Sequence, residues 1–184
     1  MAIDRIDWHW DGVTDAVSDD EHWERAGAHI GYYIEWAFNK GWANPDVHSA
    51  EDIQDVLNSN INGLQYLMEY CDAKFLDDDL NEEGKRFTSY AYHKYVEDFE
   101  KITGHKMYTK NYNRQDLQAV FKYLDEIYEN YLNNPQQIQA KNESRNAINE
   151  KILSSKLNQI VLITFVLVIF AVMIYGIVLA FTLI

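Results

Sequence analysis

The sequence of 184 residues contains a single cysteine, Cys71, and only 16 lysines and arginines against 29 acidic residues. One cysteine excludes an intramolecular disulfide framework and a cysteine-rich zinc site, and it fits a reducing compartment. We interpret Cys71 as a packed side chain, because free cysteines are usually buried. The sequence also lacks a Gly-rich phosphate loop, a nucleophile elbow and a cysteine–histidine pair with a plausible base, so we predict no enzymatic activity and no cofactor.

The shortage of basic residues is greatest in the first part of the chain, where residues 1–80 hold 18 Asp and Glu against 4 Lys and Arg. Such a surface repels phosphate backbones, which argues against nucleic-acid binding, and it attracts a basic protein partner. The alternative is that the charge only keeps the protein soluble. The predicted partner-binding residues are acidic, with two tryptophans as anchors: Asp15, Asp19, Asp20, Glu21, Glu24, Asp77, Asp78, Asp79, Trp10 and Trp42.

A secretory leader is also missing, because the first ten residues have neither a basic start nor a continuous apolar run. One long apolar run does occur, from Ile160 to Ile184, without a single charge. As a helix it would be ~37 Å long, enough to cross a bilayer. Four basic residues precede it, which favours a cytoplasmic location for the residues before it. We therefore predict a single-pass inner-membrane protein with a cytoplasmic helical domain (1–135), a polar stalk (136–157) and a transmembrane helix in the lipid bilayer (158–184).

Runs of alternating strand residues are absent, so the predicted fold is all-α, with a compact domain of four to five helices, a helical stalk and the C-terminal span. Apolar residues at helical spacing predict helices over Asp20–Lys40, Ala50–Phe75, Asn81–Thr103 and Asn113–Leu132. The second of these is either one helix or a pair of helices divided at Gly63. The expected N-caps are Ser18 or Asp19 for the first helix, Ser49 for the second and Asn113 for the last. Gly27 and Gly31, four residues apart on one face of the first helix, should let another backbone or ring come close.

Three histidines are the candidates for chemistry. His22 and His29 are seven residues apart on the first helix and therefore share nearly one face, and His9 lies upstream. Together with carboxylates they can form a metal site, and a metal-dependent hydrolase is one hypothesis that follows. The spacing lacks the His-Glu-x-x-His pattern of metalloproteases. We favour a structural, hydrogen-bonded role and predict no metal.

Several motifs resemble those of a family of small, otherwise uncharacterised bacterial domains. They lie between about residues 3 and 132 and comprise Asp7-Trp8, the segment Ala26-Gly27-Ala28-His29-Ile30-Gly31, Trp36-Ala37, the segment from Leu80 to Phe87 and the Tyr-rich stretch from Tyr90 to Tyr95. Domains of this kind are similar to proteins placed beside polymorphic toxins, including Rhs and type VI secretion effectors, where they resemble immunity proteins.

The resemblance implies an immunity protein that binds a cognate toxin and occludes its active site. The predicted span, which departs from the soluble form of the family, would anchor it in the membrane. Acidic side chains would pair with Lys and Arg of the toxin, and aromatic side chains would act as buried anchors. The alternative is a tail-anchored adaptor or assembly protein, which would recruit a partner to the membrane without inhibiting it. A toxicity rescue assay separates the two, because an adaptor binds without protecting.

Overall fold

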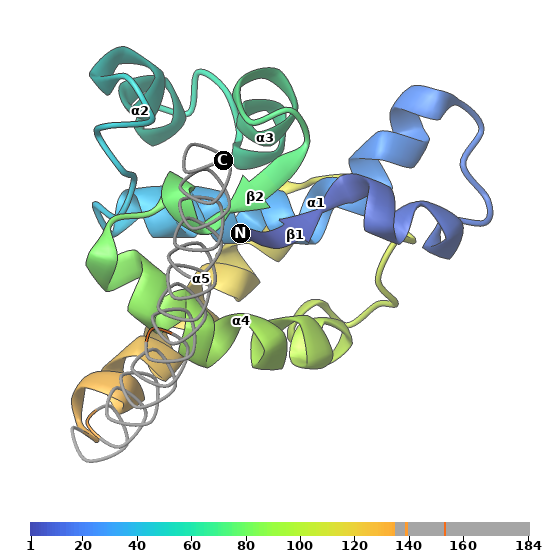
Figure 1. The fold of residues 1–184 in the computed structure, drawn as a ribbon. Coiled ribbons are helices and arrows are strands. Elements are labelled where there is room, and N and C mark those ends of the chain that lie inside the picture. The colour runs from blue at the N-terminus through green and yellow to red at the C-terminus, as the bar shows by residue number, and fades with distance from the viewer. Residues whose placement is uncertain (135–138, 140–152, 154–184) are drawn as a thin grey trace, which may run out of the picture. The chain divides into compact units, whose positions relative to one another are not determined.

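The computed structural model describes residues 1–134, 139 and 153 of the chain, and residues 1–133 form one compact unit. Its elements are, in order, β1 (Ala2–Arg5), the 3-10 helix η1 (Ile6–Gly12), α1 (Asp19–Asn39), α2 (Ala50–Leu57), α3 (Gly63–Tyr70), β2 (Lys74–Leu76), the 3-10 helix η2 (Asp77–Asp79), α4 (Glu82–Thr103) and α5 (Arg114–Leu132). Figure 1 shows α1 running through the middle of this unit, with α2 and α3 on one side of it and α4 and α5 on another.

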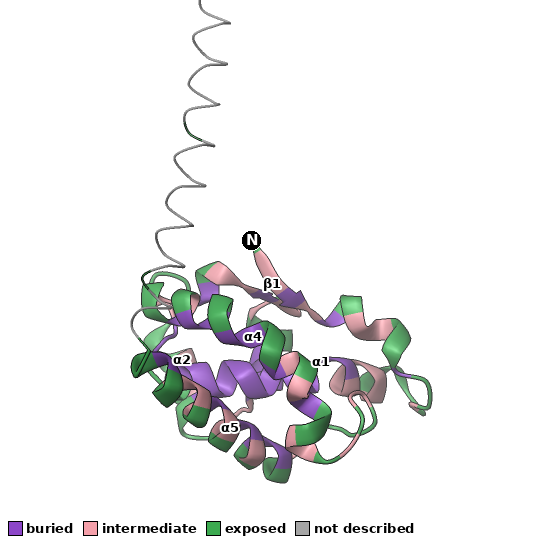
Figure 2. Ribbon diagram, turned by 90° about the horizontal axis from the view of Figure 1, so that it is seen from below, coloured by how far each residue is buried: buried purple, intermediate pink, exposed green. Residues whose placement is uncertain are grey.

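Helix α1 forms the centre of the core. Every residue from Ala26 to Phe38 is buried, because the other elements cover all of its faces. Figure 2 shows this helix in purple between helices whose outer faces are exposed. Its aromatic residues pack against rings from several elements, so that Trp36 contacts Trp42, Phe87 and Tyr128. Large aromatic side chains bury much apolar area, and this core therefore accounts for a large share of the hydrophobic stabilisation.

The helix ends follow the predicted capping chemistry. Ser18, Ser49 and Asn113 each accept a hydrogen bond from the backbone N–H three residues later, which satisfies a donor left free at the start of the helix. Gly41 and Gly104 both have φ +75°, a left-handed conformation that ends α1 and α4. Gly63 does begin a separate helix, because Asn62 and Gln65 form a capping box before it.

The predicted all-α fold is wrong in one respect within this unit, because β1 and β2 pair as a two-stranded antiparallel sheet. Ala2 lies opposite Leu76 and Arg5 lies opposite Lys74. The strands have four and three residues, too few to show an alternating pattern in the sequence. Their pairing joins the N-terminus to the segment after α3, and only the folded chain brings these two segments together.

The prediction of a transmembrane helix as part of the fold is also corrected. None of the helices in the part of the chain that the structure describes is long and apolar enough to cross a membrane. Those helices carry charged residues on their outer faces, as an amphipathic helix on a core does. The predicted stalk and the predicted span from Ile160 to Ile184 lie outside the described residues, apart from Gln139 and Leu153.

Candidate functional site

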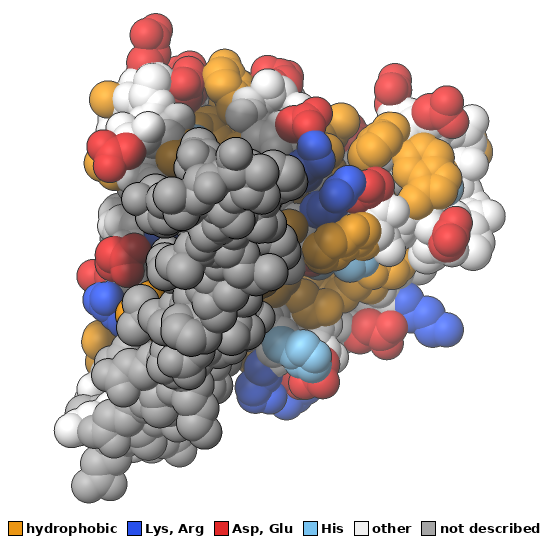
Figure 3. Space-filling model, in the orientation of Figure 1, with side chains coloured by type: hydrophobic (Ala, Val, Ile, Leu, Met, Phe, Trp, Pro, Cys, Tyr) orange, Lys and Arg blue, Asp and Glu red, His pale blue; other side chains and the backbone are white. Residues whose placement is uncertain are grey.

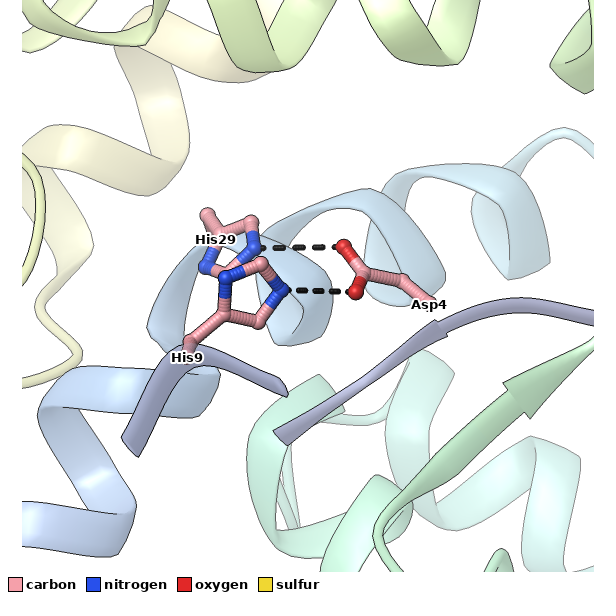
Figure 4. A group of neighbouring side chains, drawn as sticks. All are labelled: Asp4, His9 and His29. Carbon is pink, nitrogen blue, oxygen red and sulfur yellow. Dashed lines mark hydrogen bonds and ion pairs between the residues drawn. The ribbon is translucent and has the colours of Figure 1, made fainter. Parts of the chain in front are cut away.

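The candidate site is centred on the N-terminal segment of the chain, and a buried carboxylate fixes the path of this segment. Asp4 of β1 is 5% exposed and faces His9 of η1 and His29 of α1 (Figure 4). Its Oδ1 accepts hydrogen bonds from the Arg5 N–H at 2.7 Å and from His9 Nε2 at 2.6 Å. Its Oδ2 accepts from the Tyr92 hydroxyl at 2.8 Å and from His29 Nε2 at 3.3 Å. One side chain therefore ties β1, η1, α1 and α4 together.

These hydrogen bonds also set the charge of the group. Burial raises the pKa of Asp4, but the hydrogen bonds from His29 and His9 outweigh burial and hold that pKa well below its usual range. Burial lowers the pKa of His29, so this imidazole is neutral near pH 7. With its proton on Nε2, facing Asp4, His29 has a bare Nδ1 that has no hydrogen-bond partner among the described residues.

His9 connects the carboxylate to a tyrosine. The Tyr108 hydroxyl donates to His9 Nδ1 at 2.7 Å, while His9 Nε2 donates to Asp4. Burial and the charge of Asp4 raise the pKa of Tyr108, which keeps the hydroxyl protonated. A crevice behind the group, which His29 and Tyr108 help to line, is too narrow for a water-sized sphere. The arrangement is thus a hydrogen-bonded support without room for a substrate.

The structure brings together two of the three histidines proposed from the sequence. The ligand atoms of Asp4, His9 and His29 lie within 4.8 Å of one another, which is a donor set that can hold a metal ion. His22 is elsewhere: its Nε2 donates to the Trp10 carbonyl at 2.7 Å and its ring stacks on Trp10. Because both Nε2 atoms of the group already donate to the carboxylate, hydrogen bonding explains this cluster without an ion.

The Asp4 cluster holds a short segment that carries most of the exposed acidic side chains near the N-terminus. We define the acidic arm as residues 7–20, which comprise most of η1, the following loop and the first residues of α1. Trp8 is 59% exposed and Val17 is 91% exposed. The carboxylates exposed around them belong to Asp7, Asp11, Asp15, Asp19 and Asp20. Figure 3 shows acidic side chains around hydrophobic ones at this end of the molecule.

Contacts on the inner side hold the acidic arm against α1. Ile6, just before the arm, is fully buried against Gly27, where an added Cβ would lie 2.6 Å from Ile6 Cδ1. Trp10 packs on His22 and Trp23. On the outer side, the Arg5 guanidinium lies 5.7 Å from the centre of the Trp8 ring and pairs with Asp7. The arm therefore presents its exposed tryptophan from a fixed backbone.

The structure places the predicted partner-binding residues in different environments. Asp15, Asp19, Asp20 and Asp78 are exposed. Glu21 and Glu24 are half-buried and used within the molecule, since Glu21 pairs with Arg25 and Glu24 accepts from Asn111. Asp77 pairs with the N-terminal amine of Met1.

The expectation of exposed contacts is wrong at Asp79 and Trp42. Asp79 is 5% exposed and accepts from the Leu76 N–H, and Trp42 is 3% exposed among Trp36, Phe87 and Tyr128. Trp10 is half-buried, and the exposed tryptophan is its neighbour Trp8. The register of the sheet also separates the two acidic segments. Residues 77–79 lie beyond the start of β1 and the acidic arm lies beyond its end.

A second buried group was missed by sequence reasoning. His48, Cys71 and Asp79 bring their ligand atoms within 4.8 Å of one another. Burial and the charge of Asp79 raise the pKa of the Cys71 thiol to about 12 in the metal-free protein, so the thiol is mostly protonated near pH 7. No local spacing marks this group or Asp4, because each joins segments more than twenty residues apart.

Comparison with known proteins gives one match. A family model described as a domain of unknown function (DUF7832) matches residues 2–114, which is more than half of the chain and includes the acidic arm and both buried groups. No match is found among curated proteins or among solved structures.

Proposed function

Because this chain belongs to the DUF7832 family of domains of unknown function, we propose its function from the acidic arm: it is an inhibitory binding protein for a basic protein partner. The observation that carries the proposal is the exposed Trp8 on a fixed backbone, surrounded by the carboxylates of the arm. Tryptophan is enriched among the residues that dominate binding energy, and surrounding charge selects and steers the partner.

The charges of the arm are poorly compensated within the protein. Arg5 pairs with Asp7, and Arg25 pairs with Asp15. No Lys or Arg of the described residues forms an ion pair with the remaining three carboxylates of the arm, which belong to Asp11, Asp19 and Asp20. A basic partner gains charge pairing at these positions without breaking internal pairs, and the field of the arm accelerates its approach.

Inhibition, rather than binding alone, is the part of the proposal that rests on the resemblance to toxin-associated immunity domains. The arm would occupy a basic cleft of a cognate toxin, with Trp8 in a pocket and the carboxylates on Lys and Arg side chains. The buried Asp4 cluster supports this role, because it holds the arm in place before binding and so reduces the ordering cost of association.

The test uses the full chain as bait in cells that carry the native partner, with two variants beside it. Trp8→Ala removes the anchor, and a triple variant, Asp11→Asn, Asp19→Asn and Asp20→Asn, removes three charges while keeping side-chain size. The matched control, Glu100→Gln, Glu126→Gln and Glu129→Gln, removes the same charge from exposed positions of α4 and α5.

We expect the wild type and the control to capture one basic protein that is toxic when expressed alone and harmless when co-expressed. Trp8→Ala should weaken its binding about 30-fold, as loss of ~2 kcal/mol at an anchor does. The triple variant should slow association roughly 10-fold at low salt. Equal binding by all four proteins would show that the acidic arm is not the binding surface. A captured partner that is not toxic would contradict the proposed inhibition.

A further inference from the structure

The end of α3, η2 and the more distant start of α2 meet at the second buried group. His48 lies just before the N-cap of α2, Cys71 is the C-cap residue of α3, and Asp79 is the last residue of η2. His48 and Asp79 are each 5% exposed, whereas Cys71 is half-buried and reaches the surface. The group is separate from the acidic arm and from the Asp4 cluster.

The decisive feature is an unpartnered nitrogen that faces the group. His48 Nδ1 is hydrogen-bonded to the Tyr66 hydroxyl at 2.8 Å. His48 Nε2 is buried and has no hydrogen-bond partner among the described residues, although it lies 3.4 Å from Asp79 Oδ1. That separation falls within ion-pair distance, but its geometry is not that of a hydrogen bond. Buried polar atoms without partners are rare in native proteins and point to a missing ion or water.

The orientation of the other atoms agrees with a ligand set. In the tautomer whose Nδ1–H donates to the Tyr66 oxygen, the lone pair of His48 Nε2 is directed at Asp79, and metal-binding histidines are commonly fixed in this way. The Leu76 N–H donates to Asp79 Oδ2 at 2.6 Å and leaves Oδ1 facing the histidine. Each of these two ligands is thus held by a hydrogen bond through its other polar atom.

The distances suit tetrahedral coordination. Bonds of about 2.0 to 2.3 Å place the ligand atoms of a tetrahedral zinc site roughly 3.3 to 3.8 Å apart. His48 Nε2 and Asp79 Oδ1 already have such a separation, 3.4 Å. The Cys71 sulfur lies within 4.8 Å of both, so a small side-chain movement would bring it to the separation that the metal requires.

We propose that His48, Cys71 and Asp79 form a zinc-binding site with one open coordination position. A nitrogen, a sulfur and a carboxylate oxygen are ligands that zinc accepts together, whereas calcium and magnesium require oxygen ligands. The half-buried position of Cys71 gives the ion a path from solvent and leaves the fourth position for water or a partner's side chain. The ion would tie the start of α2, the end of α3 and η2 into one unit.

Binding of Co²⁺ to the site can be measured by optical absorption. Cys71 is the only cysteine of the chain, so any cobalt–thiolate band must come from it. The metal-free full-length protein is titrated with Co²⁺, and a thiolate-to-cobalt charge-transfer band then reports Cys71 and no other residue. We expect the band to saturate at one Co²⁺ per chain and to disappear on addition of one equivalent of Zn²⁺. A protein that develops no such band would overturn the proposal.

Variants assign the remaining ligands. His48→Gln and Asp79→Asn should each weaken Co²⁺ binding at least ~10-fold, since even the loss of an outer-shell contact costs that much. His93→Gln, at a histidine whose side chain is 87% exposed, is the matched control and should change nothing. Asp4→Asn should also leave the band intact, and a loss of the band there, with folding preserved by circular dichroism, would contradict the assignment.

A measurement on the wild type covers the case in which a variant does not fold. The rate at which a thiol reagent labels Cys71 is compared with and without a slight excess of Zn²⁺. Coordination should protect the sulfur and slow labelling at least ~10-fold, and removal of the ion by a chelator should restore the rate. An unchanged rate would show that zinc does not bind this thiol.

Discussion

Asp4 shows how much of this fold depends on a single carboxylate. It receives hydrogen bonds from four donors, which come from the adjacent backbone, two imidazoles and one hydroxyl. A carboxylate is the only side chain of this size that offers acceptors alone, so every lone-pair direction can face a donor. The buried negative charge is stable here because it is fully hydrogen-bonded, which is the condition under which proteins tolerate such charges.

Asp4→Asn should therefore lower the free energy of unfolding by about 2 to 4 kcal/mol. The amide keeps the shape of the side chain but turns one acceptor into a donor, which then faces either His9 or the Tyr92 and His29 pair. Urea unfolding of the full-length protein measures the effect. Asp7→Asn, at an exposed residue paired only with Arg5, is the control and should cost less than about 1 kcal/mol. Equal costs for the two variants would show that the Asp4 network is not important for stability.

His29 gives the fold a defined response to pH. Its pKa is lowered by burial, so the unfolded chain binds a proton near pH 6.5 more readily than the folded protein does. Stability is therefore full above pH 6.5 and is lost as the pH falls below it, with a slope of up to ~1.4 kcal/mol per pH unit. The lowered pKa of Asp4 adds a further loss below about pH 4.

His29→Asn should flatten the stability profile between pH 6.5 and pH 5, even though the variant is less stable at pH 7.5. Chemical unfolding at a series of pH values provides the comparison, and the exposed His93→Gln variant should follow the wild type. If His29→Asn and the wild type lose stability in parallel over this range, the loss belongs to another group.

At the scale of elements, the close approach of α1 and α3 depends on two glycines. A Cβ on Gly31 would lie 2.6 Å from the Leu64 backbone nitrogen, and a Cβ on Gly63 would meet the Gly31 carbonyl oxygen. The buried Glu35 accepts a hydrogen bond from the Gly63 N–H at 2.8 Å and so satisfies a donor at the start of α3. An added Cβ at either glycine would therefore meet mainly backbone atoms of the other helix, which cannot move aside as a flexible side chain can.

Gly31→Ala should cost about 3 kcal/mol or more, because its added methyl group meets backbone rather than a flexible side chain. Gly104→Ala is a matched substitution at the end of α4, where nothing lies within 4 Å of an added Cβ and only the left-handed φ of +75° opposes it. Its expected cost is about 1 to 2 kcal/mol. Thermal unfolding ranks the two variants, and the reverse order would contradict the proposed backbone contact.

The elements also show what the sequence can and cannot predict. Helix positions follow from local signals, namely the caps at Ser18, Ser49 and Asn113, and the prediction that Gly31 admits another backbone is confirmed by Leu64. Strand pairing between residues 2–5 and 74–76 depends on contacts that no local pattern encodes. The site was also only partly predictable. The sequence identified His9 and His29 as possible site residues, but their partners Asp4 and Tyr92 come close to them only in the folded chain.

The solvent exposure of individual side chains was the property that the sequence predicted least well. Trp8, Trp10 and Trp42 have the same chemistry, yet they are exposed, half-buried and buried, because each tryptophan's position in the fold decides what covers it. Asp79 likewise continues an acidic run in sequence but turns inward to the Leu76 N–H and His48. Composition correctly indicates an acidic surface, and only the structure assigns it to particular residues.

For the whole molecule, the dominant electrostatic quantity is the net charge of −13. Most carboxylates of residues 1–80 have no basic residue of the same segment to pair with, since 18 acidic side chains face 4 basic ones. Charge of one sign repels itself and destabilises the folded state relative to the more expanded unfolded chain. Added salt shortens the screening length from ~30 Å at 0.01 M to ~8 Å at 0.15 M, so this repulsion is suppressed at physiological ionic strength.

The melting temperature of the full-length protein should therefore rise by about 3 to 5 °C between low and physiological NaCl concentration, as a gain of ~1 kcal/mol predicts. The surface ion pairs, such as Lys94 with Asp98, also weaken with salt, but exposed pairs of this kind contribute little to stability. Calorimetry at pH 7.5 measures the rise, and the triple Asp→Asn variant of the acidic arm should show a smaller one. A melting temperature that falls with salt would mean that ion pairing outweighs repulsion, and the acidic surface would then stabilise the protein rather than serve an external partner.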